Sequence, residues 1–197
     1  MSYRQITLPA FPLNLVLLPG ETTKLHIYEE RYKQLVEECI QNDACFGIPF
    51  TEKGKILPYG SEVRISRILK SYETGSMDIL IESKGIFKLM EFTEVLRPKR
   101  YGAAKVEILP LPQRVLLPAL QDATVQYFGT VQNKLIDYDT VAKLTVYSVA
   151  TALQLTNAEK YRLIASPNPQ MQLLNQINFI IHIIHSEQQI KDRFIEN

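Results

Sequence analysis

The sequence predicts an α+β protein, in which a small, partly closed β-barrel with one helix comes first and a helical bundle follows. Short apolar stretches with turn residues every eight to twelve residues or so fill the first half, as in compact barrels. After Pro110, Pro112 and Pro118 glycine almost vanishes and the apolar spacing becomes helical. The last helical pattern, from Pro169 to about residue 195, is the longest. We therefore expect a β domain over residues 1–112 and a helical subdomain over residues 113–197.

The chain begins with two predicted strands around a turn. Residues 15–18 are uninterrupted apolar residues between prolines, a pattern typical of a strand buried on two faces or of an edge strand entering a core. Pro19 and Gly20 favour a tight turn. Beyond it, Leu25 and Ile27 alternate with polar or aromatic residues, which predicts a second strand with one apolar face.

A helix is predicted to follow at once. Glu29 and Glu30 favour the positive end of its dipole. Its apolar residues recur at helical spacing and should form one stripe facing the core: Tyr32, Leu35, Val36, Cys39 and Ile40.

The remaining strands of the β domain are short and separated by polar turns. We expect them at residues 44–50, 61–72, 78–82, 87–92 and 101–109. The alternation slips near Ser66 and Arg67, which suggests a bulge or a sharp bend. Lys84 and Gly85 form either a second turn or a bulge.

Helical spacing continues through the second half, over residues 117–135 and 144–153. Thr156 and Glu159 have the spacing of a capping box, and Asn168 before Pro169 has the pattern of a helix start. The final helix is apolar over more than half its circumference near residues 173–184 and then turns polar. Two outcomes stay open for its tail: a second copy or another protein covers it, or its own domain does.

One set of residues carries a family resemblance. These residues are Leu8-Pro9, Phe11-Pro12-Leu13, Val16-Leu17, Pro19-Gly20, Leu25-His26-Ile27-Tyr28-Glu29, Arg31-Tyr32, Tyr59-Gly60, Val63-Arg64-Ile65, Ile79-Leu80-Ile81, Phe87-Lys88-Leu89, Leu155, Glu159-Lys160-Tyr161, Leu163-Ile164 and Leu173-Leu174. In order and spacing they resemble the N-terminal, substrate-binding domain of the ATP-dependent Lon protease. The resemblance covers nearly the whole chain.

The resemblance implies a PUA-like β domain joined to a helical bundle, with a role in recognising proteins. It implies a stand-alone relative of that domain, since the motor and protease parts of Lon follow this domain. The candidate substrate- or partner-binding residues are Leu13, Pro19, His26, Tyr28, Arg31 and Tyr59. Arg31 is also expected to fix the helix to the barrel, either by pairing with a carboxylate such as Glu62 or Glu82 or by bonding exposed carbonyls, and His26 to pack at the sheet edge.

Catalytic and metal-binding motifs are missing from the sequence. Gly54 and Lys55 are followed by Ile56, where a phosphate-binding loop needs Ser or Thr, and no G-x-S-x-G elbow occurs. His182 and His185 lie three apart without a zincin pattern, and a pair of partly buried histidines is the expectation. Cys39 and Cys45 lack metal-site spacing and are expected to be buried, inert thiols. We therefore expect no enzyme activity, no metal and no cofactor.

Charge and hydropathy limit the classes of binding partner and the cellular location that we expect. The net charge of +1 offers no clustered positive field for nucleic acid or an anionic membrane. No segment has the length of a membrane span, and the N-terminus lacks the pattern of a secretory signal, so a cytoplasmic protein is expected.

Three functions remain open. The first is a non-catalytic module that binds exposed or unfolded polypeptide segments, as an adaptor to a protease or unfoldase, with a homo-oligomer through the last helix. The second is an RNA-binding PUA-like protein. The third is a small-molecule enzyme with a pocket near His26, Tyr28 and Arg31.

Overall fold

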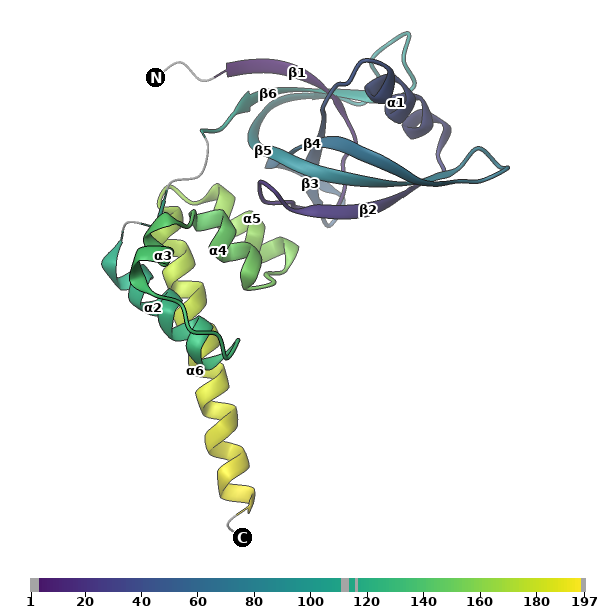
Figure 1. Ribbon diagram of the computed structural model, residues 1–197. Helices are drawn as coiled ribbons and strands as arrows, with labels where there is room; N and C mark the ends of the chain where they lie inside the picture. Colours follow the sequence, from purple (N-terminus) through teal and green to yellow (C-terminus); the bar gives the residue numbers. More distant parts are fainter. Residues whose placement is uncertain (1–3, 111–113, 116, 196–197) are drawn as a thin grey trace. The chain divides into compact units, whose positions relative to one another are not determined.

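The computed structural model describes residues 4–110, 114–115 and 117–195, with side chains described as far as residue 187. The chain divides into two compact units (Figure 1). The first unit comprises Met1–Leu111 together with Leu155–Ala165, and the second comprises Pro112–Gln154 and Ser166–Asn197. The first unit therefore contains a helix that follows most of the second unit in the sequence.

The first unit is built on a six-stranded sheet with the order β2-β5-β4-β3-β1-β6. The strands are β1 (Arg4–Ala10), β2 (Thr22–Ile27), β3 (Phe46–Glu52), β4 (Lys55–Ser71), β5 (Met77–Thr93) and β6 (Gly102–Ile108). Because β6 also pairs with β5, the pairing runs in a ring through five strands, and β2 extends it at one side. The β1–β3 step is held in register only at Ala10 and Gly47. The sheet is thus partly closed, as the sequence predicts, although the short β1–β3 pairing leaves it short of a complete barrel.

Two long, irregular strands allow the sheet to curl. The pairing of β4 with β5 shifts register at three places, one of them between Ile65 and Arg67, where the sequence predicts a bulge. Residues 78–82 and 87–92 are parts of the single strand β5, so Lys84 and Gly85 form no turn. One long strand thus replaces the two short strands that the pattern suggests. Its first half pairs with β2 and its second half with β6.

Helix α1 (Glu30–Gln41) contributes one face to the main core of this unit. Tyr32, Leu35, Val36 and Cys39 are buried in a cluster with residues of β2, β3, β4 and β5. The predicted stripe is therefore confirmed for these residues but wrong for Ile40, which is 43% exposed. Burial raises the pKa of the Cys39 thiol to about 12, so this cysteine stays protonated and unreactive near neutral pH.

Val16, Leu17 and Leu18 are buried and Leu15 is partly buried, but residues 15–18 form no strand, which corrects the sequence-based expectation. Side chains of the sheet take the place of a neighbouring strand. The Ser61 hydroxyl accepts a hydrogen bond from the Leu17 amide and donates one to the Leu17 carbonyl, both at 2.9 Å. The Ser83 hydroxyl donates to the same carbonyl at 3.1 Å. These bonds satisfy a buried backbone that a pattern of apolar residues cannot distinguish from a strand.

Substituting Ser61 with alanine is expected to destabilise the first unit by about 2 kcal/mol, because the buried Leu17 amide loses its acceptor. Ser83→Ala is the matched control and should cost about 1 kcal/mol or less, since Ser61 still serves the Leu17 carbonyl. Urea titration followed by circular dichroism measures both. Equal losses for the two variants would contradict this account of the segment.

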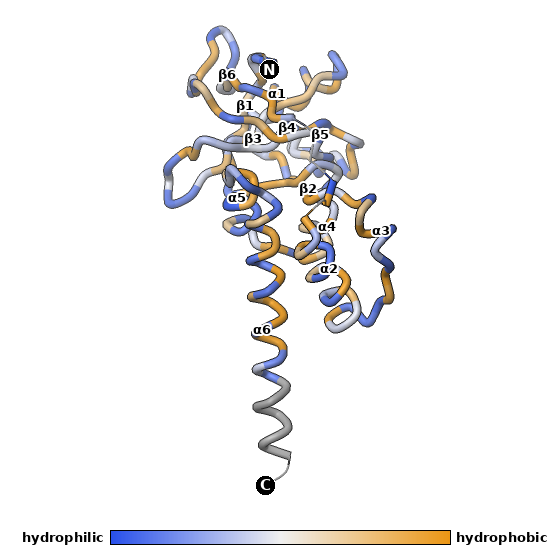
Figure 2. The backbone as a smooth tube through the Cα atoms, turned by 90° about the vertical axis from the view of Figure 1, so that its left-hand side faces the viewer, coloured by the Kyte–Doolittle hydropathy of each residue, from blue (hydrophilic) through white to orange (hydrophobic). Residues whose placement is uncertain are grey.

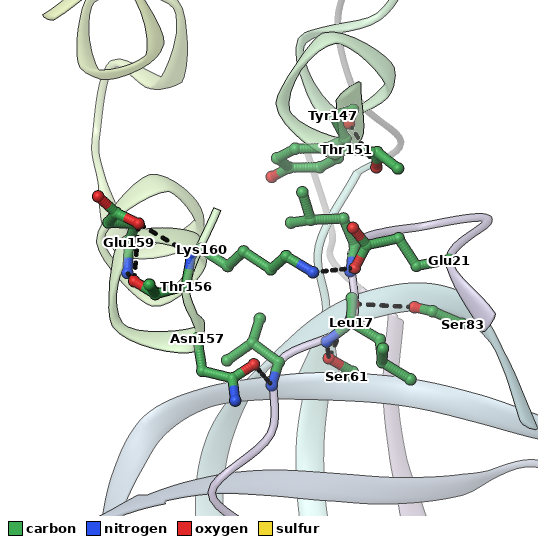
Figure 3. Close-up of polar contacts among 12 residues, drawn as sticks. Leu17, Glu21, Ser61, Ser83, Tyr147, Thr151, Thr156, Asn157, Glu159 and Lys160 are labelled. Atoms are coloured by element: carbon green, nitrogen blue, oxygen red, sulfur yellow. Dashed lines mark hydrogen bonds and ion pairs between the residues drawn. The ribbon is translucent and has the colours of Figure 1, made fainter. Parts of the chain in front are cut away.

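Helix α5 (Asn157–Ala165) packs on the sheet of the first unit (Figure 3). The Asn157 side chain accepts a hydrogen bond from the Val16 amide and donates one to the Asn14 carbonyl. The Lys160 ammonium lies 2.6 Å from a Glu21 carboxylate oxygen, and both side chains are almost buried. The Tyr161 ring stacks on Phe50 with centroids 5.0 Å apart. Residues 14–21 are thus held by side chains of helix α5 and also by Ser61 and Ser83 of the sheet.

The capping box predicted for this helix is confirmed. The Thr156 amide donates to the Glu159 carboxylate at 2.8 Å, and the Glu159 amide donates to the Thr156 hydroxyl at 3.3 Å. Asn168 accepts from the Met171 amide and begins the last helix, α6 (Pro169–Ile195), as predicted. These local signals are legible because each needs only residues three positions apart.

The second unit is helical. It consists of α2 (Pro118–Thr130), α3 (Tyr138–Lys143), α4 (Val146–Ala152) and α6, with α2 and α4 packed on α6. The expected helical spacing over residues 117–135 extends too far, because α2 ends at Thr130 and Leu135 is 98% exposed. The expected helix over 144–153 corresponds to α4, which begins with a capping box at Thr145.

As far as residue 187, helix α6 carries both hydrophobic and hydrophilic residues (Figure 2). Leu173, Ile177 and Ile181 are buried, whereas Phe179 is 61% exposed. His182 and His185 are both exposed, which corrects the expectation of two partly buried histidines. The polar tail of α6 lies mostly beyond the described side chains, so the two predicted outcomes for it, contact with another molecule or with its own domain, stay predictions.

Candidate functional site

A cavity of about 360 Å³ opens at the start of α1. Five elements or their flanking residues meet there: the end of β1, the first turns of α1, the start of β4, the end of β5 and the start of β6. The lining residues are Ala10, Pro12, Arg31, Tyr32, Ile56, Phe92, Glu94 and Gly102. The cavity lies entirely within the first unit.

The cavity has an aromatic and aliphatic wall. Tyr32 is only 7% exposed, and its ring stacks on Phe11 with centroids 3.6 Å apart. Burial raises the pKa of the Tyr32 hydroxyl, so it remains neutral. Pro12, Ile56 and Phe92 complete the apolar lining. Arg31 and Glu94 add charged groups, so the lining combines apolar and polar surface.

The charged groups at this cavity are of both signs. Arg31 pairs with Glu29 at 2.8 Å, and its guanidinium lies 4.5 Å from the centre of the Tyr32 ring. The expected pairing of Arg31 with Glu62 or Glu82 is therefore wrong, because a carboxylate two residues away reaches it first. Glu94 is exposed, and no ion pair of Glu94 occurs among the residues that the structure describes.

His26 and Tyr28 lie on another surface beside β2. The His26 imidazole Nδ1 is 2.6 Å from Asp78, whose second oxygen accepts from the Tyr72 hydroxyl at 2.8 Å. The hydrogen bond from His26, followed by that from Tyr72, lowers the pKa of Asp78. Tyr28 is 66% exposed, with its ring centroid 6.0 Å from that of His26. His26 thus bridges β2 and β5, and Tyr28 is exposed to solvent.

Leu13, Pro19 and Tyr59 occupy other parts of the first unit. Leu13 continues the pairing beside β3, since its amide donates to Pro49 and its carbonyl accepts from Thr51. Tyr59 lies edge-on to Tyr161 of α5, with centroids 6.1 Å apart. Of the six predicted site residues, Arg31 alone lines the described cavity, so the set does not converge on one place.

A family model described as the ATP-dependent protease La (LON) substrate-binding domain matches residues 7–182. The chain belongs to this family. The match spans both units, and it confirms the resemblance that the sequence suggests. It is confined to the substrate-binding domain, which is a non-catalytic part of Lon.

Solved Lon N-terminal structures share the fold. A Lon N-terminal domain protein from Xanthomonas campestris is 22% identical, with a TM-score of 0.68 over 88% of this chain and 98% of that one. The N-terminal domain of Mycobacterium avium complex Lon protease is 14% identical, with a TM-score of 0.62 over 88% of this chain and 97% of that one. At these identities the likeness establishes the Lon N-terminal fold alone. No significant match is found among curated proteins.

Membrane-spanning helices and metal-binding clusters are both absent from the part of the chain that the structure describes. None of its helices is long and apolar enough to cross a membrane. No group of three or more His, Cys, Asp or Glu side chains in that part is placed to hold a metal ion.

Sequence reasoning missed most of the residues that line the cavity. Pro12 and Tyr32 lie inside the matched Lon motif, so the motif could have pointed to them. Ile56, Phe92 and Glu94 carry no local signal, because they come from the ends of strands that meet only in the folded barrel.

Proposed function

We propose that this chain is a recognition module that binds exposed or unfolded segments of other polypeptides. The observation that carries the proposal is the cavity beside Tyr32, whose lining combines apolar residues with Arg31 and Glu94, on a chain of the Lon substrate-binding family. A volume of about 360 Å³ has room for one or two large side chains of a segment, while the rest of the segment stays outside.

The composition of the wall indicates what would be recognised. Tyr32, Phe92 and Ile56 make contacts that depend on area rather than on a fixed pattern of hydrogen bonds. Folded proteins bury their large apolar residues, whereas unfolded segments expose them. The cavity therefore favours unfolded over folded polypeptides.

We propose further that the chain acts as an adaptor, holding such segments for a protease or unfoldase. Support comes from the description of the family, in which substrate binding serves an ATP-dependent protease. Copurification from the native cell tests this step, with recovery of an ATP-dependent protease as the expected result. Its absence under conditions that retain bound substrates would count against the adaptor role alone.

The cavity itself is tested with Ile56→Asp, which places a charge on its wall at a partly buried position. Affinity for reduced, alkylated α-lactalbumin should fall by about tenfold, because an apolar contact is lost and a carboxylate is desolvated. Native α-lactalbumin should bind weakly to both forms. The measurement is fluorescence anisotropy of the labelled unfolded protein.

Leu135→Asp is the control, since Leu135 is an exposed apolar residue outside this unit. It should leave binding unchanged. Equal losses for both variants, or a wild-type chain that binds native and unfolded lactalbumin alike, would refute recognition through this cavity.

Neither alternative function is favoured by a specific observation. An enzyme using His26, Tyr28 and Arg31 needs these side chains at one pocket, but only Arg31 lines the cavity. RNA binding needs clustered positive charge, and the chain carries a net charge of only +1.

A further inference from the structure

Strand β4 has an edge without a partner strand. It pairs with β3 only as far as Val63, opposite Phe46, and from Arg64 to Ser71 it pairs with β5 alone. Among the residues that the structure describes, no backbone hydrogen bond from this stretch reaches another segment. The outward amides and carbonyls of β4 are therefore available to an added strand.

A groove runs along this edge. Its volume is about 180 Å³, and one wall is the unpaired part of β4 while the other is the C-terminal turn of α1 and the loop after it. The lining residues are Cys39, Ile40, Asp43, Ala44, Arg64, Ile65, Ser66, Arg67 and Ile68. The groove occupies the side of β4 that β3 covers earlier along the strand.

The groove presents apolar side chains to solvent. Ile40 is 43% exposed and Ile68 is 46% exposed, although each belongs to a regular element. The two residues flank the groove from opposite walls, on α1 and β4. Alternate side chains of an added strand would point to the same face, so one apolar side chain could contact both isoleucines.

The charged side chains of the groove indicate which kind of segment it would bind. The groove contains two arginines and one aspartate, and Arg64 pairs with Asp43. Arg67 is exposed, and in the described part of the chain no carboxylate pairs with it. Its guanidinium is therefore available for a carboxylate of the ligand at the edge where an added strand would lie.

We propose that this groove binds an extended polypeptide segment that alternates apolar and acidic residues, by adding it as a strand to the free edge of β4. Backbone hydrogen bonds hold the segment, Ile40 and Ile68 contact its apolar side chain, and Arg67 pairs with its carboxylate. The site is separate from the cavity beside Tyr32, with which it shares no lining residue.

The irregularity of β4 limits the length of the added strand. The pairing with β5 shifts register between Ile65 and Arg67 and again between Ile68 and Lys70. Bulges of this kind shorten the regular part of an edge, and a bulge with a charge often serves to prevent strand addition. The proposal therefore requires that a short segment binds and that Arg67 attracts rather than repels it.

The test uses a fluorescein-labelled synthetic peptide that alternates Val and Asp, compared with a peptide that alternates Val and Lys. The wild-type chain should bind the acidic peptide about tenfold more tightly. N-methylation of alternate backbone amides on the edge-facing side should weaken binding of the acidic peptide about tenfold, because these amides can no longer donate to β4. Methylation of the other amides is the control.

Variants locate the peptide. Arg67→Glu should reverse the preference toward the basic peptide, and Ile68→Asp should weaken binding of both peptides. Lys88→Glu is the matched control, since Lys88 is an exposed cation on β5 outside the groove, and it should change nothing. Circular dichroism shows that each variant retains the fold.

Three results would overturn the proposal: an unchanged preference in Arg67→Glu, equal binding of the two N-methylated peptides, or loss of peptide binding in Ile56→Asp but not in Ile68→Asp. The last result would place the peptide in the cavity beside Tyr32. Conversely, failure of Ile56→Asp to affect unfolded lactalbumin would leave the strand-addition site standing.

Discussion

Gly60→Ala is expected to destabilise the first unit by about 3 kcal/mol or more. Gly60 lies in β4 between Pro49 of β3 and Phe87 of β5. A methyl group there would collide with the Ile48 carbonyl oxygen and would lie 2.6 Å from the Phe87 ring. Phe87 is fully buried, and the carbonyl belongs to the backbone of a central strand, so neither can move aside cheaply.

Urea titration followed by circular dichroism measures this loss. Gly129→Ala is the matched control, because no atom lies within 4 Å of the added carbon in α2, and alanine favours the helix. It should stabilise the second unit by about 0.5–1 kcal/mol. A Gly60→Ala protein as stable as the wild type would show that the barrel wall is looser than these contacts imply.

Lys160→Met is expected to release helix α5 from the sheet at a cost of about 2–3 kcal/mol. Lys160 and Glu21 have side chains only 14% and 10% exposed, and their charged atoms are 2.6 Å apart. Removing the ammonium leaves the Glu21 carboxylate almost buried, with the Leu18 amide as a remaining donor. Hydrogen exchange of the α5 amides should accelerate by about 30- to 150-fold.

A double-mutant cycle with Glu21→Gln isolates the pair. The double variant should recover part of the loss, because no unpaired buried charge remains. Lys84→Met is the control, since the Lys84–Glu82 pair is more than a third exposed, and it should cost about 0.5 kcal/mol or less. Similar exchange rates of α5 in the wild type and Lys160→Met would mean that the Tyr161 stacking and the Asn157 hydrogen bonds hold the helix without the ion pair.

Several elements were predictable because their signals are short. The caps of α5 and α6 need a hydroxyl, carboxamide or carboxylate three residues from the amide that it meets. The buried stripe of α1 follows from helical periodicity, and the bulge in β4 from a slip in alternation at Ser66. The Lon resemblance could be recognised from the sequence because many of its motif residues lie close together in one stretch near the N-terminus.

The cavity was predictable only in part. Arg31 was chosen from the motif, and it does line the cavity, but its partner is Glu29 rather than a carboxylate of the barrel. His26 and Tyr28 belong to the same motif and yet face another surface, because β2 ends before the cavity begins. The spacing of residues in the sequence does not show which surface a strand residue and a helix residue face, because the turn between the strand and the helix sets their relative directions.

Residue patterns alone established the Lon family, the α+β class and the main helices, because caps, turns and periodicity act within a few residues. Tertiary structure decided three other features. Residues 15–18 lie beside Ser61 and Ser83, 44 and 66 positions from Leu17, and so need no strand partner. Helix α5 joins the segment between β1 and β2 through Asn157, 141 positions from Val16. The cavity beside Tyr32 and the groove along the free edge of β4 exist only in the folded first unit, because their lining residues come from segments that are distant in the sequence.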